Sequence, residues 1–94
     1  MKNKFNKNLN KNWKVKNNRI FREYVFSDFK TALKFVSEVG KIAEKENHHP
    51  TINLSYRKVK IESFTHSAEK LTEKDFNLAK KVDKEYKNYK KLNE

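Results

Sequence analysis

Three histidines are the residues of this sequence best suited to chemistry. His48, His49 and His66 are its only histidines, and all fall within residues 48–66. Histidine suits proton transfer because its ordinary pKa, about 6.5, lies close to neutral pH. The chain has no cysteine, which excludes thiolate nucleophiles, disulfides and zinc–thiolate sites. The cluster therefore points to general acid and base catalysis, which can expel a hydroxyl as water without a nucleophile.

Metal binding is the main competing chemistry for these histidines. Two adjacent histidines and a third at position 66 do not match the usual ligand spacings, and the HExxH pattern is absent. Glu44 lies four residues before His48 and could share a helix face with it. A glycine-framed serine is also absent, and a single glycine cannot form a phosphate-binding loop. We therefore expect neither a metal nor a cofactor.

The histidines should be positioned by the ends of two elements. Apolar residues recur at three- and four-residue steps over residues 29–43, which predicts an amphipathic helix. Pro50 must end this helix near residues 47–49, because proline pushes the preceding residue out of the helical region. His48 and His49 then lie at a helix C-terminus, whose partial negative charge favours an imidazolium. His66 ends a strand, and the three rings could line one pocket if that strand runs back toward the helix.

Four segments are expected to be extended: 13–15, 19–26, 52–56 and 59–61. Aromatic and β-branched residues indicate the second of these, and period-two alternation indicates the last two. The expected turns are Asn17-Asn18 and Arg57-Lys58. Asparagine tolerates left-handed backbone geometry, which favours a tight turn at the first of these sites.

Both predicted helices carry capping signals. Ser27 or Asp28 can cap the first helix, and Thr72 with Asp75 forms a capping box that opens the second. Gly40 lies inside the first helix at a cost of about 1 kcal/mol relative to alanine, so we expect close packing there. The order β-β-α-β-β-α favours an α+β fold, a four-stranded antiparallel sheet with two helices packed on one face.

Length and charge bound the organisation of the chain. Its 94 residues suffice for one domain, and no apolar run approaches the roughly 18 residues of a membrane helix. The net charge is +11, and residues 1–22 carry lysines and arginines but no acid. We expect residues 1–11 to form a flexible basic arm and residues 12–94 a single domain. The nearly balanced charge of the rest argues against nucleic acid as a partner, and a cytoplasmic location is expected because no signal-peptide pattern is visible.

An ordered set of residues resembles the pterin-4a-carbinolamine dehydratase family, also known as the dimerisation cofactor of a homeodomain transcription factor. The matching residues are Ala43-Glu44, His48-His49-Pro50, Tyr56, Thr65-His66, Leu71-Thr72, Asp75 and Phe76-Asn77-Leu78-Ala79. The resemblance covers about residues 12–84.

The resemblance implies a hydro-lyase of tetrahydrobiopterin recycling, which dehydrates 4a-hydroxytetrahydropterin to quinonoid dihydropterin without a cofactor. It implies that His48 and His66 form the acid/base pair, with His49 binding the substrate and sharing the proton transfer. The implied substrate contacts are His48, His49, Pro50, Thr65, His66, Ser67 and Ala68. Glu44 and Asp75 are candidate supporting residues, although Asp75 is equally explained as a helix cap.

The resemblance also implies a homodimer or homotetramer. The alternative function is a non-catalytic dimerisation, assembly or transcription-cofactor module of the same fold. Retention of all three histidines favours the enzyme.

Overall fold

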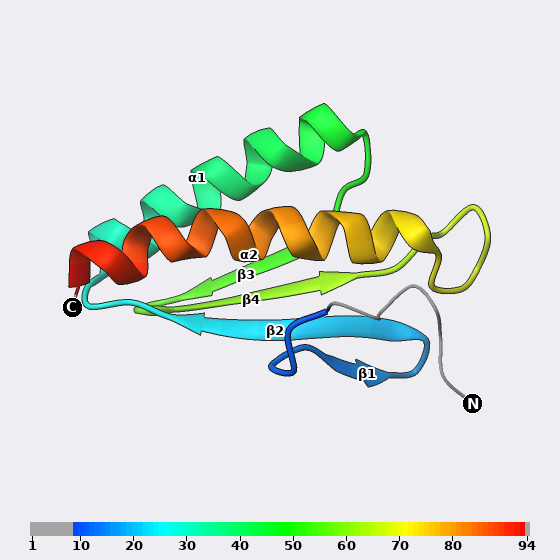
Figure 1. The fold of residues 1–94 in the computed structure, drawn as a ribbon, viewed down its shortest axis with the longest axis horizontal. Helices are drawn as coiled ribbons and strands as arrows, with labels where there is room; N and C mark the ends of the chain where they lie inside the picture. Colours follow the sequence, from blue (N-terminus) through cyan, green and yellow to red (C-terminus); the bar gives the residue numbers. More distant parts are fainter. Residues whose placement is uncertain (1–8, 94) are drawn as a thin grey trace.

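The computed structural model describes residues 9–93, with side chains up to Tyr89, as one antiparallel sheet under two helices (Figure 1). The elements are β1 (Lys14–Lys16), β2 (Arg19–Val25), α1 (Phe29–Glu46), β3 (Thr51–Ser55), β4 (Lys58–Ser63) and α2 (Glu73–Asn93). The strand order is β1-β2-β4-β3 and every pairing is antiparallel. Both helices cover the same face of the sheet, so the predicted fold class is confirmed. No helix in the described part of the chain is long and apolar enough to cross a membrane.

The core lies between the sheet and the helices because alternate strand residues point toward them. Ile20 and Tyr24 on β2 and Val59 and Ile61 on β4 are almost completely buried. The helices contribute mainly alanine, valine and aromatic side chains. Five aromatic rings meet at tilted or edge-to-face angles, as ring quadrupoles favour: Tyr24, Phe26, Phe35, Tyr86 and Tyr89.

The two hairpin turns depend on residues with left-handed backbone geometry. Asn17 and Asn18 have φ angles of 53° and 63°, so the turn predicted there is confirmed. The prediction for the second hairpin was wrong by one residue. Tyr56 has a φ of 53° and is 70% exposed, so it lies in the turn instead of continuing the buried face of β3. A two-residue connection needs such geometry, and alternation in the sequence does not show where a strand stops.

Local hydrogen bonds set the ends of α1. The Asp28 carboxylate accepts a hydrogen bond of 2.8 Å from the Thr31 amide, which makes Asp28 the N-cap. At the other end Asn47 adopts a left-handed φ of 53°, and its amide donates to the Ala43 and Glu44 carbonyls. This C-cap turns the chain immediately before His48, as the position of Pro50 predicted.

Gly40 is not closely packed, which contradicts the expectation from its position inside α1. A Cβ placed there would have nothing within 4 Å among the described residues. Its φ is not positive either, so the backbone does not require glycine. Nothing in the described part of the chain explains the glycine.

A carboxylate joins the first hairpin to α2. Asp83 accepts hydrogen bonds from the Trp13 indole (2.9 Å), an Arg22 guanidinium nitrogen (2.9 Å) and the Tyr24 hydroxyl (2.6 Å). The Arg22 guanidinium also lies 4.5 Å from the centre of the Tyr24 ring. Burial, and next the Asp83 carboxylate, raise the pKa of Tyr24, so its hydroxyl remains a donor to Asp83. These contacts tie α2 to β2 and to the residue just before β1.

Candidate functional site

The C-terminal end of α1 and the β4–α2 loop enclose a shallow hollow of about 240 Å³. It is lined by Asn47, His48, His49, Phe64, Thr65, His66, Ser67 and Lys74. All three histidines therefore face one space. The antiparallel sheet is responsible, because β4 ends on the side where α1 also ends.

His48 is held by a buried carboxylate. Its Nε2 lies 2.7 Å from Asp75 Oδ1, and the two side chains are 11% and 0% exposed. An ionised carboxylate can only accept, so Nε2 carries the proton and donates it to Asp75. This contact leaves Nδ1 as the ring nitrogen of His48 that can interact with a bound molecule.

Asp75 is surrounded by hydrogen-bond donors. Its Oδ1 also accepts from the Ser63 hydroxyl (2.6 Å), and its Oδ2 accepts from the Thr65 hydroxyl (2.6 Å) and the Thr72 amide (2.9 Å). Burial alone would raise the pKa of Asp75, but these bonds and the one from His48 outweigh it and hold the pKa below its usual range. The carboxylate is therefore ionised at neutral pH while it contacts His48.

Asp75 also completes the predicted capping box. Its backbone amide donates to the Thr72 carbonyl at 3.0 Å while its side chain accepts from the Thr72 amide. The Thr72 hydroxyl accepts from the Lys74 amide at 3.2 Å. The same carboxylate thus caps the helix through Oδ2 and contacts His48 through Oδ1.

His49 has a different environment. Its Nε2 lies 2.6 Å from Glu44 Oε2, and the two side chains are 59% and 77% exposed. Glu44 and His49 come from the last turn of α1 and the residues just after it, so this pair forms locally. Water competes for an exposed pair, which therefore orients the ring only weakly.

His66 is positioned by the backbone and by a neighbouring ring. The Glu69 amide donates to the His66 carbonyl at 3.1 Å, within a turn that Thr65 closes by accepting from the Ala68 and Lys70 amides. The Phe64 ring meets the imidazole edge-to-face, with centroids 5.0 Å apart. No hydrogen bond to the ring nitrogens is present among the described residues, so both are available to a bound molecule.

The remaining predicted contacts divide into two groups. Thr65 and Ser67 line the hollow, although the Thr65 hydroxyl donates its proton to Asp75. Pro50 and Ala68 are not among the lining residues. Pro50 sets the chain direction after His49, and the Ala68 amide helps to close the turn after His66.

Sequence reasoning missed three lining residues, Asn47, Phe64 and Lys74. Lys74 lies in the first turn of α2, beside Asp75, and brings a positive charge to the rim of the hollow. A signal was present, because the capping box located the start of this helix one residue from Lys74. Phe64 carried no comparable signal, because the face of the sheet on which its side chain lies depends on the inward and outward alternation of side chains along β4.

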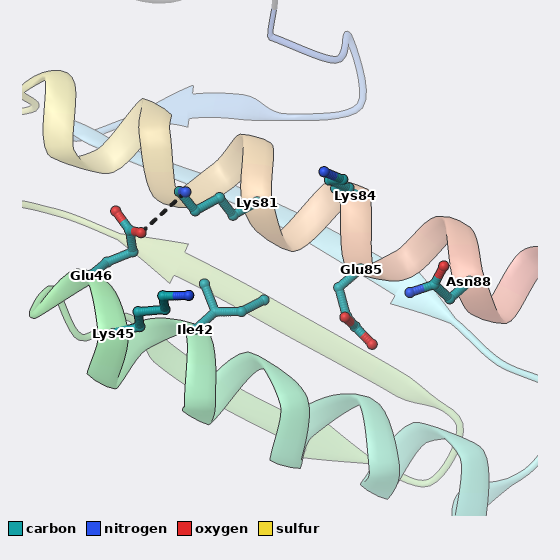
Figure 2. Close-up of a pocket in the computed structure, with 7 residues that line it drawn as sticks. All are labelled: Ile42, Lys45, Glu46, Lys81, Lys84, Glu85 and Asn88. Atoms are coloured by element: carbon teal, nitrogen blue, oxygen red, sulfur yellow. Dashed lines mark ion pairs between the residues drawn. The ribbon is translucent and has the colours of Figure 1, made fainter.

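A second hollow, of about 300 Å³, lies between the two helices, and no histidine lines it (Figure 2). Ile42, Lys45 and Glu46 line it from α1, and Lys81, Lys84, Glu85 and Asn88 line it from α2. Lys81 and Glu46 form an ion pair of 3.3 Å across it. Flexible lysines and glutamates without a titratable histidine do not provide the acid and base that the sequence predicts.

Metal ligation is not favoured by the arrangement of the described side chains. Between residues 9 and 89 no three histidine, aspartate or glutamate side chains converge as a metal site would require. His48 and His49 each direct one ring nitrogen to a different carboxylate. The three rings thus line one hollow, but they do not converge on one point where a metal ion could bind.

Fold and site together define a class of protein: a small α+β domain whose histidine-lined hollow is suited to proton transfer on a bound small molecule. The chain belongs to the pterin 4 alpha carbinolamine dehydratase family, whose sequence model matches residues 1–85. The family resemblance read from the sequence is thereby confirmed.

Similar proteins cover most of this chain. A protein of Alkaliphilus metalliredigens, provisionally named pterin-4-alpha-carbinolamine dehydratase, is 49% identical over 78 residues, which cover 82% of this chain and 70% of that protein. A protein of Sulfurisphaera tokodaii with the same provisional name is 42% identical over 76 residues, covering 81% and 82% of the two chains.

Two solved structures share the fold. The transcriptional coactivator/pterin dehydratase of Brucella melitensis superposes with a TM-score of 0.76 at 32% identity, covering 80% of this chain and 82% of that one. A pterin dehydratase-like protein described as a RuBisCO assembly factor in the alpha-carboxysome gives a TM-score of 0.65 at 20% identity, covering 78% and 84%. The second likeness concerns the fold alone.

Proposed function

We propose that this chain is a 4a-hydroxytetrahydrobiopterin dehydratase that uses histidine general acid and base catalysis. The observation that carries the proposal is the contact of 2.7 Å between His48 and the buried Asp75, in a hollow shared with His49 and His66. Membership of the dehydratase family supplies the substrate class. The geometry supplies two histidines on different elements, which can act on different atoms of one substrate.

The proposed step eliminates water from the carbinolamine. The C4a–O bond breaks, and the departing hydroxide takes a proton from one imidazolium. A ring N–H of the pterin gives its proton to a second, neutral imidazole, and the electron pair of that bond forms the new double bond of the quinonoid product. The protein gains one proton and loses one, so it returns to its starting charge without a redox step.

His48 and His66 are assigned to these two transfers. The Asp75 carboxylate stabilises the positive charge that His48 bears whenever both of its ring nitrogens are protonated, and it fixes the ring so that Nδ1 faces the substrate. His66 approaches from the β4–α2 loop with both nitrogens free of hydrogen bonds to the described residues. A proton donor of this kind contributes roughly 10²–10⁴ in rate when it lies within hydrogen-bond reach.

His49 is assigned mainly to substrate binding. Its ring is exposed and only weakly fixed by Glu44, so it can adjust to the pterin. Thr65 and Ser67 line the same hollow. Lys74 adds a positive charge that suits the pterin carbonyl oxygen or an anionic substituent.

The decisive experiment is a turnover assay with chemically prepared 4a-hydroxytetrahydrobiopterin. We expect the purified chain to accelerate formation of the quinonoid product well above the spontaneous rate, and to do so after exhaustive treatment with EDTA. Activity that disappears with EDTA and returns with one divalent metal would contradict the proton-transfer mechanism. A folded protein without any turnover would favour the non-catalytic assembly module.

A further inference from the structure

The face of the sheet opposite the helices carries an excess of positive charge. Residues paired across antiparallel strands share a face, so the register places the outward residues of all four strands together. Five cations point outward: Lys14, Lys16, Arg19, Lys58 and Lys60. Two carboxylates, Glu23 and Glu62, accompany them, which leaves three uncompensated charges. No described helix covers this open face (Figure 1).

Two aromatic rings lie among these cations. Phe21 is on β2 and Phe64 follows the last residue of β4, and these are the two central strands of the sheet. Lys60 Nζ lies 4.8 Å from the centre of the Phe21 ring, and the Arg19 guanidinium lies 4.6 Å from the centre of the Phe64 ring. Continuing the β2–β4 register by one residue makes the two rings diagonal neighbours, which on such a sheet are about 7–8 Å apart.

A hollow lies within this open face. It has a volume of about 280 Å³ and is lined by Lys16, Asn17, Arg19, Phe21, Lys60 and Glu62. A positively charged space beside an aromatic ring can hold a planar base and its phosphate together. It shares no lining residue with the histidine hollow, although Phe64, the second ring of this face, also lines the histidine hollow.

The charge indicates what kind of molecule can cover this face. A second copy of the chain would bring a face of the same sign against it, which is unfavourable when the charges are desolvated. An anionic partner is favoured instead. Cations interleaved with aromatic rings on an open sheet are the combination by which proteins hold single strands, because bases stack on the rings and phosphates pair with the cations.

We propose that the open sheet face binds single-stranded nucleic acid without strong sequence preference. Phe21 and Phe64 serve as stacking platforms, and the five cations pair with the phosphates. The charge count along the chain argued against such a partner because residues after position 22 are nearly balanced. That count could not show that strand register brings five cations of β1, β2 and β4 together on one face, beside two aromatic rings.

The test is fluorescence anisotropy of the full-length protein with a labelled 15-nucleotide strand of mixed sequence. We expect a dissociation constant in the micromolar range at 50 mM salt. With five phosphate contacts, a fourfold rise in salt should weaken binding on the order of 100-fold. Reversing two cations in K16E/K60E should weaken it by at least about 10-fold, while dehydratase turnover stays unchanged.

Stacking is tested separately from charge. Phe21→Leu should weaken binding roughly 5- to 100-fold, as expected for the loss of one stacked base, and Phe21→Tyr should restore it. Circular dichroism checks that each variant is folded. Equal binding by the leucine and phenylalanine proteins would overturn the stacking platform.

Matched controls locate the site. K34E/K87E makes the same charge change on exposed positions of the two helices and should leave binding nearly unaltered. An equal loss in that variant, or a loss only when Lys2, Lys4 and Lys7 are replaced by glutamine, would overturn the sheet face as the site. Displacement of the strand by poly-glutamate at equal charge concentration would show that the face takes acidic proteins instead.

Discussion

The three histidines of the hollow differ in what holds them, and this difference bears on the roles proposed for them. His48 donates to a buried carboxylate, His49 contacts an exposed one, and His66 has only an aromatic neighbour for its ring. A rigidly held ring can keep a proton at a fixed point, whereas a loosely held ring contributes mainly contact. The held ring of His48 supports its proposed role as a proton carrier, whereas the role proposed for His66 rests on the family resemblance and on its two free ring nitrogens.

Alanine substitution should separate these roles. His48→Ala and His66→Ala should each lower turnover by roughly 10²–10⁴, which corresponds to about 2.7–5.5 kcal/mol in the barrier. His49→Ala should mainly raise KM. The double variant of His48 and His66 should lose less than the two single losses combined if the rings act as one unit. Near-full turnover in both folded single variants would exclude this mechanism.

Asp75→Asn should impair catalysis by changing which nitrogen of His48 is protonated. The Thr72 amide can only donate, so the amide oxygen of the new asparagine must face Thr72 and its NH₂ must face His48. That contact requires an unprotonated Nε2 and moves the proton to Nδ1. We expect turnover to fall on the order of 10²-fold with little change in KM, and the proton shift should appear in the ¹⁵N chemical shifts of the imidazole. An unchanged ring spectrum would leave Asp75 a helix cap only.

Asp75 should also make the stability of the fold depend on acid. Its pKa is lowered in the folded chain, whereas an unfolded aspartate titrates near 3.9. Between these two values the unfolded chain binds more protons, so the free energy of unfolding falls as pH falls through this window and is constant above it. Urea unfolding from pH 2 to 6 should show a smaller decline in Asp75→Asn.

Asp28 provides the comparison for this acid dependence. Hydrogen bonds from Thr31 lower the pKa of Asp28, but this carboxylate is exposed at the start of α1. Solvent screens it, so Asp28→Asn should change the acid dependence less than Asp75→Asn. A larger change in the Asp28 variant would show that the network around Asp75 contributes little to folding.

At the scale of elements, Asp83 joins β2 to α2. The Arg22–Asp83 ion pair is nearly enclosed, with side chains 10% and 15% exposed, and Arg22 Nε has no hydrogen-bond partner among the described side chains. An enclosed charge of this kind depends strongly on its one carboxylate. The contact therefore couples the first hairpin to the helix that carries Lys74 and Asp75.

Asp83→Asn should destabilise the protein by about 3 kcal/mol, because it leaves the Arg22 charge uncompensated. Trp13 is the only tryptophan and donates to Asp83, so its fluorescence should change together with the lower melting temperature. Glu69→Gln makes the same chemical change at an exposed position and should alter neither signal. A normal melting temperature in the Asp83 variant would show that the helix and hairpin are held by apolar packing alone.

At the scale of the whole molecule, one side has the features of a surface for self-association. β3 is an edge strand without any charged residue, although edges are usually protected by charge or proline. α1 lies over β3 and β4, and its flank turned away from α2 exposes Phe29 (46%) and Leu33 (49%). Helical spacing places Gly40 on the same flank. A second copy that packs closely there would fill the open space around Gly40.

We expect a symmetric dimer or larger oligomer that contains this side, because a two-fold axis lets β3 pair with its own copy. Leu33→Lys should weaken association on the order of 100-fold, since the axis places the loss of a buried leucine in the interface twice. Val15→Lys, at an exposed valine on the opposite edge of the sheet, should not. Sedimentation of the original protein as a monomer at micromolar concentration would refute the oligomer.

The sequence by itself determined the elements and the ends that carry the histidines. The cap at Asp28, the capping box at Thr72 and the turn at Asn17-Asn18 depend on hydrogen bonds and backbone geometry within four residues. Such local preferences are visible in the order of residues, as is the period of a buried face. For the same reason, Pro50 was enough to place the end of α1.

Only the tertiary structure decided which partners these residues have. His48 and Asp75 are 27 positions apart, and Trp13 and Asp83 are 70 apart. The role of Asp75 beyond its cap, the contacts of Asp83, the open space at Gly40 and the cations gathered on the open sheet face all follow from strand order and register. No local pattern encodes these, because they arise when the chain closes on itself and long-range packing decides which side chains meet.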